Sequence, residues 1–512
     1  MATDATPRST PVRILVGLAR LVWTVVVVLV PLAGVWVASS LAAFANGPVW
    51  LAVLAGALAF PLLPLAWELV SELLRRRAQA RGPKRLSELR TRGGGSAPEQ
   101  RGLSVWDRLI LRTLAVNLVF VGGLLWSQPA SVYAAVSARG DWMLDGVEAD
   151  WADRARAQLH AAAERFEWLH ERTHANEYVE LVDPSYSAAE VAPEPPPATG
   201  TADSPAPVPV AELAEAVAEA RYPHWPQADQ PHPLIVDMPA EAEVSIAAVA
   251  AYVVAHEPDP RQRVKALHDW VATRVRYDLE AAEVGPIPPQ DAESTFTTRT
   301  SVCAGYANLL AALITEAGGH AVVVTGDARG RGLELSGEGH AWNAVELDGE
   351  WTLIDATWDA GGRQQASGRW EFEYGSDYLF VPPEVIGLTH FPDDPRWQLR
   401  AEPLTRGEFL RQPVLRPRFY AQGFDLIRPD RSQVSVTDEV ELELGNREGL
   451  FVVAGAIAPD GSRHDCEIRG RATIEVACTL PGPGQYEVQL FANHEAYGSF
   501  RYLGSLQVNA SG

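Results

Sequence analysis

The chain is organised around one short stretch, which reads Thr300-Ser301-Val302-Cys303-Ala304-Gly305-Tyr306-Ala307-Asn308. Behind Cys303 the apolar residues recur at helical spacing, at Tyr306, Leu309, Leu310, Leu313 and Ile314. Gly318-Gly319 then follows as a typical helix C-cap. Cys303 is therefore expected at a helix N-terminus, where the positive end of the helix dipole favours a thiolate.

Two further pieces downstream supply an imidazole and a carboxylate. They read Gly339-His340-Ala341-Trp342-Asn343-Ala344-Val345 and Trp351-Thr352-Leu353-Ile354-Asp355-Ala356-Thr357-Trp358. Residues 340–347 and 351–355 are predicted strands, and the Asp348-Gly349 pair between them is a strong hairpin signal. In such a hairpin His340 and Asp355 lie near the outer ends of paired strands, as cross-strand neighbours.

A thiol, an imidazole and a carboxylate in this order are the parts of a cysteine nucleophile, its base and the group that orients the base. On this interpretation Asp355 holds the His340 ring in the tautomer that accepts the Cys303 proton. Taken one at a time, each residue is more typical of a structural role: a small buried cysteine, a core histidine, a strand-end aspartate. Their occurrence together in this order favours the catalytic interpretation.

These pieces resemble the transglutaminase-like superfamily, whose fold is a papain-like thiol core. The matching features are the helix-start cysteine in V-C-A-G-Y-A, the H-A-W-N before a strand and the D-A-T-W that ends the next strand. The similarity covers roughly residues 245–400 and is greatest to the bacterial and kyphoscoliosis-peptidase-like branch. The resemblance implies an α+β fold in which a helix that starts at the cysteine packs on an antiparallel sheet. It also implies Cys303 as nucleophile, His340 as base and Asp355 as orienter, although domains of this family also occur as non-catalytic scaffolds.

Charge is segregated along the 512-residue chain. Residues 1–138 carry 14 Arg or Lys and 6 Asp or Glu, a net charge of +8, whereas the whole chain carries −22. The remainder therefore carries −30, which disfavours binding to nucleic acid or to an anionic surface. The length predicts two or three folded units, and no cofactor is expected.

Three apolar runs near the N-terminus are long enough to span a bilayer. They cover about residues 21–45, 49–70 and 113–136, with Trp near several of their ends. Pro61 and Pro64 are expected to kink the second run. Buried core helices are the other source of such runs, but three of them together predict that residues 1–138 form a membrane domain with three transmembrane helices.

The arginines predict the orientation of these spans. Basic residues flank the first run, and the Arg-rich stretch 75–112 separates the second run from the third. Because basic segments stay in the cytoplasm, the N-terminus and residues 75–112 are expected inside and the residues after about 138 outside. The chain is thus expected to be an integral protein of a bacterial cytoplasmic membrane, with its remaining domains extracytoplasmic. The first run is too long, and too soon followed by a partner span, for a cleaved signal peptide.

Residues 139–182 are predicted to be a helical segment, and they contain the pattern H-E-x-x-H as His170-Glu171-Arg172-Thr173-His174. Taken literally, this is a zinc-protease helix. Such helices are usually uncharged at the two middle positions and apolar around them, whereas here Arg172 lies in the middle of a Glu- and Arg-rich stretch. A solvated helix is the preferred interpretation, and no metal site is predicted.

The next boundaries follow from composition. Residues 183–234 are rich in Pro and Ala, which is typical of an extended linker. The catalytic domain is expected over residues 235–405, with an amphipathic helix that begins at Pro260. The Pro- and Thr-rich stretch 281–299 is a candidate wall of a substrate groove.

Two additional imidazoles lie inside the predicted catalytic domain. His268-Asp269 is on the amphipathic helix and is expected at the surface. His390 is a spare imidazole whose Phe and Pro neighbours indicate packing.

Residues 413–512 change to short alternating runs separated by turns, which predict a β-sandwich of immunoglobulin-like size. Cys466 and Cys478 lie 12 residues apart around a predicted turn at Arg469-Gly470. Outside the membrane they are expected to form a disulfide. That leaves Cys303 as a free thiol in an oxidising compartment, which agrees with a reactive role.

The predicted triad attacks an amide carbonyl, so the expected substrate is a protein or a peptide. The acyl-enzyme is resolved by water in a peptidase or amidase, or by an amine in acyl transfer, and the triad alone does not choose. No calcium loop of the D-x-D-x-D-G kind is evident, which disfavours a calcium-gated cross-linker. The alternative function is a non-catalytic, membrane-tethered scaffold for protein interactions. The sequence does not predict the oligomeric state.

Overall fold

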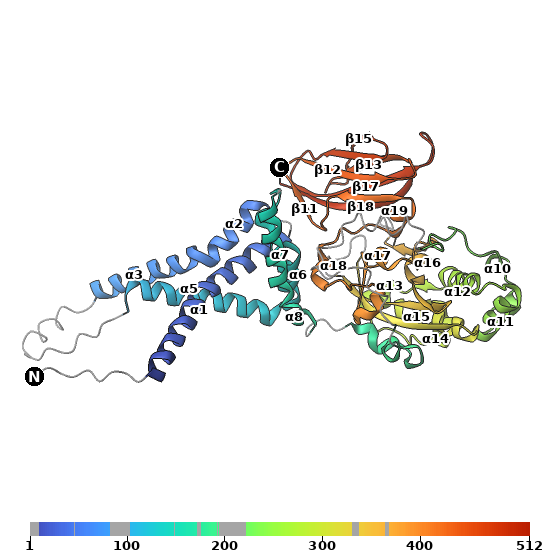
Figure 1. The fold of residues 1–512 in the computed structure, drawn as a ribbon, viewed down its shortest axis with the longest axis horizontal. Coiled ribbons are helices and arrows are strands. Elements are labelled where there is room, and N and C mark those ends of the chain that lie inside the picture. The colour runs from blue at the N-terminus through green and yellow to red at the C-terminus, as the bar shows by residue number, and fades with distance from the viewer. Residues whose placement is uncertain are drawn as a thin grey trace, which may run out of the picture. The chain divides into compact units, whose positions relative to one another are not determined.

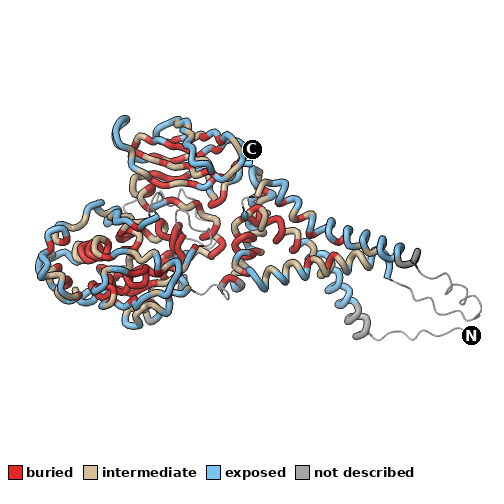
Figure 2. The backbone as a smooth tube through the Cα atoms, turned by 180° about the vertical axis from the view of Figure 1, so that it is seen from behind, coloured by how far each residue is buried: buried red, intermediate tan, exposed pale blue. Residues whose placement is uncertain are grey.

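The computed structural model describes residues 10–45, 47–81, 103–147, 149–171, 176–191, 193, 222–329, 337–363 and 368–511. By its internal contacts the chain divides into two units, Met1–Thr173 and His174–Gly512. Each unit has buried residues of its own, which Figure 2 shows along its helices and strands.

In its described residues the first unit is built from helices alone. They are α1 (Thr10–Phe44), α2 (Val49–Ala57), the π-helical turn η1 (Leu58–Leu62), α3 (Leu63–Arg81), α5 (Val105–Ser127), α6 (Pro129–Arg139), η2 (Trp142–Leu144), α7 (Asp150–Glu164) and α8 (Glu167–Glu171). Helix α1 packs against α2, α5 and α6. Among the described residues, three helical segments are long and apolar enough to cross a membrane: Gly17–Phe44, Val49–Arg77 and Val105–Ser127.

The third of these segments begins and ends earlier than the predicted run 113–136. Helix α5 begins directly after Ser104, whose side chain caps it. The helix therefore contains Arg108 and Arg112, which the predicted run excluded. Both arginines pair with Glu68 on α3, which compensates their charge. The helix ends at Ser127 because Pro129 has no N–H to continue it and starts α6 instead.

The kink predicted at Pro61 lies within η1, where Phe60 leaves helical geometry at φ −158° and ψ 127°. A break of this kind frees backbone carbonyls that lipid cannot satisfy. Asn117 on α5 is fully buried and donates its Nδ2 to the Ala59 carbonyl at 3.1 Å. This hydrogen bond accounts for a polar side chain in an otherwise apolar helix.

The second unit contains the α+β core and the β-sandwich that the sequence predicts (Figure 1). Its helical elements are η3 (Glu177–Leu181), η4 (Pro184–Tyr186), η5 (Ala188–Glu190), α10 (Pro233–Val236), η6 (Ala240–Ala242), α11 (Ile246–His256), α12 (Pro260–Arg274), α13 (Leu279–Val284), α14 (Ala292–Thr298), α15 (Cys303–Glu316), α16 (Ala356–Ala360), α17 (Pro383–Ile386), η7 (Pro395–Gln398), α18 (Arg406–Arg411) and α19 (Pro417–Ala421). The strands of its core are β1 (Arg276–Tyr277), β2 (Thr300–Ser301), β3 (His320–Ala328), β4 (Glu338–Leu347), β5 (Glu350–Ile354), β6 (Gly361–Arg363), β7 (Trp370–Phe372), β8 (Leu379–Val381) and β9 (His390–Pro392).

The core is one antiparallel sheet, in the order β8-β5-β4-β3-β9, with the cysteine helix packed on it. Helix α15 contacts β3 and β4, and α11 and α12 pack against α15. The buried side chain of Asn343 on β4 donates to the Ala307 carbonyl of α15 at 2.9 Å. This bond holds the strand against the first turns of the cysteine helix. The arrangement confirms the predicted fold class.

The predicted hairpin is formed by β4 and β5, and the turn at Asp348 and Gly349 has positive φ at both residues, 56° and 83°. That geometry is the reason for the Asp-Gly signal. The strand pairing ends at Asn343 and Ile354, so His340 and Asp355 are not the cross-strand pair expected from the sequence. They approach each other because Asp355 leaves the strand and becomes the N-cap of α16.

The start of the predicted linker 183–234 differs from an extended spacer. Residues 183–191 form η4 and η5, with Asp183 and Ser187 as side-chain N-caps. The Asp183 N–H also donates to Asn308 Oδ1 on α15 at 3.0 Å, and Ser187 pairs with Val323 on β3. These bonds join the segment to the core. The residues 194–221 of the predicted linker lie outside the described residues.

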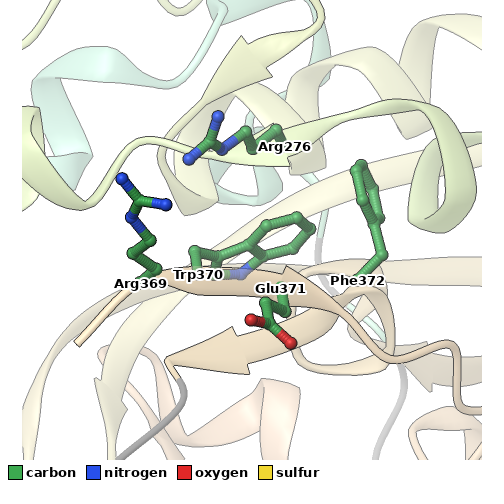
Figure 3. Close-up of a pocket in the computed structure, with 5 residues that line it drawn as sticks. All are labelled: Arg276, Arg369, Trp370, Glu371 and Phe372. Carbon is green, nitrogen blue, oxygen red and sulfur yellow. The ribbon is translucent and has the colours of Figure 1, made fainter. Parts of the chain in front are cut away.

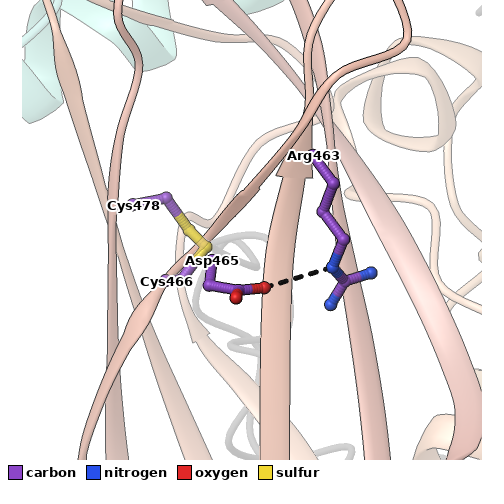
Figure 4. The surroundings of a disulfide bond; sticks show 4 residues. All are labelled: Arg463, Asp465, Cys466 and Cys478. Atoms are coloured by element: carbon purple, nitrogen blue, oxygen red, sulfur yellow. Dashed lines mark hydrogen bonds and ion pairs between the residues drawn. A yellow bond between two sulfur atoms is a disulfide. The ribbon is translucent and has the colours of Figure 1, made fainter.

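The sandwich consists of two sheets, in the orders β10-β12-β16-β15 and β11-β18-β17-β13-β14. Its strands are β10 (Phe424–Arg428), β11 (Val434–Val436), β12 (Glu439–Asn446), β13 (Phe451–Ile457), β14 (Arg463–Asp465), β15 (Glu467–Gly470), β16 (Thr473–Thr479), β17 (Gly484–Asn493) and β18 (Arg501–Ala510). Cys466 and Cys478 form a disulfide that joins the start of β15 to β16, beside the Arg463–Asp465 ion pair (Figure 4). Cys303 is the free cysteine, and it is buried.

Candidate active site

Cys303 is the first residue of α15, as predicted, and a neutral side chain caps this helix. Gln290 Oε1 accepts hydrogen bonds from the backbone N–H groups of Val302 and Gly305, at 3.1 and 3.2 Å. The Ser301 hydroxyl donates to the same oxygen at 2.6 Å. This cap does not use the Cys303 N–H, which remains at the positive end of the helix dipole. Because the cap is an amide and not a carboxylate, it adds no negative charge that would oppose a thiolate.

His340 and Asp355 form a direct hydrogen bond. His340 Nε2 lies 2.8 Å from Asp355 Oδ2, while Asp355 Oδ1 accepts the backbone N–H groups of Thr357 and Trp358 at 2.8 and 3.2 Å. This bond uses Nε2 of the ring, and Cys303 is close enough to contribute to the raised pKa of His340. The three side chains singled out in the sequence therefore lie together, with a direct hydrogen bond between His340 and Asp355.

Electrostatics favour a charged His340 in this group. Burial opposes the imidazolium, but the Asp355 carboxylate and Cys303 outweigh it and raise the pKa of His340 to about 10. Burial likewise disfavours the charged carboxylate, yet His340 and His390 hold the pKa of Asp355 far below its usual range. A protonated ring between a carboxylate and a sulfur atom is the arrangement that stabilises a thiolate.

A second histidine shares the same carboxylate. His390 on β9 places its Nε2 3.1 Å from Asp355 Oδ2. The rings of Trp342, Trp358 and Tyr378 surround it, as the expected packing role requires. The hydrogen bond to Asp355 is an additional contact that the sequence did not indicate, because only the pairing of β9 with β3 brings this residue to the site.

Two tyrosines lie near Cys303, which is completely buried. They are Tyr178 on η3 and Tyr277 on β1, and burial followed by the nearby Cys303 raises the pKa of both phenols. Asn176 holds η3 in place, since its Nδ2 donates to the His340 carbonyl at 3.2 Å. The sequence places η3 in a separate helical segment, so its position near the thiol is visible only in the folded chain.

Replacing Tyr178 by alanine is expected to increase the rate at which iodoacetamide alkylates Cys303 by about tenfold, because the variant loses a bulky buried ring near the sulfur and access to the thiolate controls its reactivity. Tyr186→Ala, on the next element η4, is the matched control and should change the rate little. The measurement is the mass of the intact full chain after timed labelling. An unchanged rate in Tyr178→Ala would show that this segment does not limit access to the thiol.

His268 and Asp269 are fully buried on α12, so their expected place at the surface is wrong. His268 Nδ1 lies 2.9 Å from Asp269 Oδ1, and its Nε2 lies 3.2 Å from Asp359 Oδ2. Lys265 Nζ completes the group at 2.8 Å from Asp269 Oδ2. These charges are buried together because they compensate one another. Asp359 belongs to α16, the helix that Asp355 caps, so the group anchors one side of the site.

This buried group predicts a pH dependence of stability. Burial opposes a charged ring, but Asp269 and Asp359 outweigh it and raise the pKa of His268 from 6.5 to about 9. The folded state therefore binds the proton more tightly. The resulting stabilisation is fully present below about pH 6.5, is lost as the pH rises through about 9, and is on the order of 3 kcal/mol. The unfolding temperature of the full chain in detergent should fall over this window, and His268→Gln should remove most of the slope. Equal slopes in the two proteins would contradict the assignment.

Of the two histidines in the H-E-x-x-H pattern, one lies in the part of the chain that the structure describes. His170, expected on a solvated helix, is buried in α8, and His174 lies outside the described residues. Within the described ranges, one group of three metal-ligating side chains has its ligand atoms close together, and it is His340, Asp355 and His390. Their hydrogen bonds to one another already satisfy these atoms without an ion.

A hollow of about 570 Å³ lies beside β1 and β7. Figure 3 shows the Arg276 side chain above the indole of Trp370, with Arg369 on one side of the indole and Phe372 on the other. Arg276 directly precedes Tyr277 in β1, whose partner strand β2 leads into the cysteine helix. The triad side chains do not line this hollow, so it is a feature adjacent to the site and not the site itself.

Comparison with known proteins gives a consistent result. A model of the transglutaminase-like superfamily matches residues 247–356, the range that holds all three triad residues. Kyphoscoliosis peptidase of Mus musculus is 28% identical over 249 residues, which cover 46% of this chain and 37% of that protein. Kyphoscoliosis peptidase of Homo sapiens is 31% identical over 178 residues, covering 34% of this chain and 27% of that protein. The Lim and transglutaminase domain protein ltd-1 of Caenorhabditis elegans is 29% identical over 149 residues, covering 26% and 21%.

This chain thus spans less than two fifths of the length of each of these relatives. The relatives agree with the kyphoscoliosis-peptidase-like resemblance, while the bacterial branch stays a prediction. The helix-start cysteine, the antiparallel sheet behind it and the match over residues 247–356 lead to one conclusion: this chain contains a domain of the transglutaminase-like superfamily.

Proposed function

We propose that this chain is a membrane-anchored thiol enzyme that acts on peptide or amide bonds, with Cys303 as nucleophile, His340 as base and Asp355 as the group that orients the base. The observation that carries the proposal is the hydrogen bond between Asp355 Oδ2 and His340 Nε2, on a ring whose pKa the nearby Cys303 also raises. The superfamily resemblance assigns the same three roles to the same residues.

The chemistry has two stages. First the Cys303 sulfur forms a bond to the carbonyl carbon of the substrate amide, and an electron pair moves onto the carbonyl oxygen. The Cys303 N–H is one hydrogen-bond donor for this oxyanion. Protonated His340 then gives its proton to the leaving amine as the C–N bond breaks, which leaves a thioester. In the second stage water or another amine attacks the thioester, His340 takes its proton, and the sulfur departs as a thiolate.

Hydrolysis is the preferred outcome of the second stage. The relatives from mouse and human are named peptidases, which supports water as the acceptor. The net charge of −30 after residue 138 favours neutral or basic protein and peptide substrates over acidic ones.

The three long apolar helices support a membrane anchor. The Arg-rich stretch 75–112 supports a cytoplasmic side for that stretch, and therefore an extracytoplasmic position for the catalytic unit. The disulfide between Cys466 and Cys478 supports the same compartment, because disulfides persist in oxidising surroundings.

A second candidate is a non-catalytic scaffold that presents the core and the sandwich to protein partners. The complete burial of Cys303 favours this alternative, since a substrate reaches the sulfur only if the residues around it move.

A thiol-reactive probe that does not cross membranes tests both candidates in intact cells. The wild-type chain should be labelled at Cys303, Cys303→Ala should not be labelled, and His340→Ala should be labelled far more slowly. Peptide-library cleavage by the purified full chain, with Cys303→Ala as control, then tests hydrolysis. Labelling that is equally slow in the wild type and in His340→Ala would favour the scaffold, and cleavage by Cys303→Ala at the wild-type rate would exclude the thiol mechanism.

A further inference from the structure

The Asp355 carboxylate accepts four hydrogen bonds, and only one of them belongs to the triad. Its Oδ1 accepts two backbone N–H groups of α16, and its Oδ2 lies 2.8 Å from His340 Nε2 and 3.1 Å from His390 Nε2. A carboxylate offers about four acceptor positions, so all of them are occupied. Asp355 is almost completely buried, and among the described residues it is the carboxylate that pairs with both rings. The second histidine therefore supplies a quarter of the hydrogen bonds that hold a buried charge.

The surroundings of His390 indicate one protonation state. Burial lowers the pKa of His390, and the charged His340 ring, with its centroid 5.5 Å away, opposes a second cation beside it. A neutral imidazole that donates from Nε2 must accept at Nδ1. The Thr389 hydroxyl lies 2.9 Å from Nδ1 and 3.1 Å from the Ile386 carbonyl oxygen, and its one proton serves Nδ1 when it points to the ring. His390 thus has a donor on one side and an acceptor on the other, in agreement with a single tautomer.

The groups that face His390 come from several elements. Asp355 and His340 are its charged neighbours, Tyr378 and Thr389 are its other polar neighbours, and the rest of its surroundings are aromatic. A residue with packing as its only role would not need an acceptor and a donor at opposite ring nitrogens. A phenylalanine of similar volume would fill the same space among these rings.

We propose that His390 is a positioning residue for the triad: as a neutral imidazole it donates its Nε2 proton to Asp355 Oδ2 and holds that carboxylate ionised and correctly oriented toward His340. The inference rests on the proposed function. His390 does not touch Cys303 or a substrate, so it acts on the thiol only through Asp355 and His340. Its position on the edge strand β9 connects the far edge of the sheet to the triad.

The test measures alkylation of Cys303 by iodoacetamide in the full chain in detergent, from about pH 5 to about pH 9. Cys466 and Cys478 are paired, so Cys303 is the free thiol that the reaction reports. His390→Phe keeps the ring volume and removes the donor. It should slow alkylation near pH 6 by about 10- to 100-fold and move the rise of the rate to higher pH. His390→Gln keeps an N–H donor and should recover most of the wild-type rate.

Two further variants keep the test decisive. His320→Phe removes an exposed histidine of the same sheet, paired with Glu346, and should leave the rate and its pH profile unchanged. Thr389→Val removes the donor to Nδ1 without altering the ring, and should slow alkylation by about threefold even if His390→Phe does not fold.

The outcomes separate this inference from the proposed function. A folded His390→Phe protein with the wild-type pH profile overturns the positioning role, and so does a His390→Gln protein that is as slow as His390→Phe. Stoichiometric zinc in the purified wild-type chain, lost in His390→Phe, would make His390 a metal ligand instead. A wild-type chain with no reactivity near pH 6 would argue against the thiol enzyme itself, whatever the variants do.

Discussion

Asp355→Ala is expected to slow the alkylation of Cys303 near pH 6 by up to about 10,000-fold, the loss in kcat that follows removal of the triad carboxylate in a serine protease. The carboxylate is the main group that raises the pKa of His340, to about 10, against the opposing effect of burial. Without it the buried ring is neutral near pH 6 and no longer stabilises a thiolate. The difference from the wild type should shrink as the pH rises, because a thiolate then forms without help from a neighbouring cation.

Asp355→Asn separates the charge from the shape of the residue. Its amide oxygen can still accept the N–H groups of Thr357 and Trp358, so the start of α16 is retained. Its amide nitrogen, however, points a donor at two imidazole nitrogens that donate in the wild type. Asp355→Asn is therefore expected to fold and yet remain slow, whereas Asp348→Asn at an exposed position should react like the wild type. A fast Asp355→Asn protein would mean that the charge is not needed.

Gly305→Ala is expected to destabilise the second unit by about 3 kcal/mol and to disturb the thiol. A Cβ at this position would overlap the side-chain oxygens of Ser301 and Thr295 and would lie 2.8 Å from Gln290 Oε1. These atoms form the cap of the cysteine helix and are buried, so they cannot move aside freely. Alanine is the better helix former by about 1 kcal/mol, but the overlap is the larger effect.

The measurements for Gly305→Ala are the unfolding temperature of the full chain in detergent and the alkylation rate of Cys303. Gly482→Ala is the control, because a Cβ there meets no atom within 4 Å. If Gly305→Ala unfolds at the wild-type temperature, the Gln290 cap is looser than its hydrogen bonds indicate.

The cap itself was not predictable from the sequence, since the stretch 281–299 suggested only a groove wall and not a side chain that caps the cysteine helix.

Local patterns in the sequence were sufficient for the elements of the site. The start of α15 at Cys303 follows from helical spacing and from a glycine C-cap. The turn between β4 and β5 follows from Asp348-Gly349, whose backbone angles only a few residue types adopt readily. The three long apolar helices follow from runs of uncharged residues. The third helix begins earlier than the uncharged run, because Glu68 compensates the two arginines in its first turns. Each of these features depends on neighbours a few positions apart.

The contacts between those elements were decided by the tertiary structure. His390 reaches Asp355 only because β9 pairs with β3 at the far edge of the sheet, and Tyr178 lies near Cys303 because Asn176 joins η3 to β4. His268 is buried among charged partners, and one of them, Asp359, comes from another helix, α16. The physical reason is that helix and strand formation is set by the spacing of residues along the chain. The partner that a buried polar group finds is set by which distant backbone segments pack together, and a single sequence carries no local record of that choice.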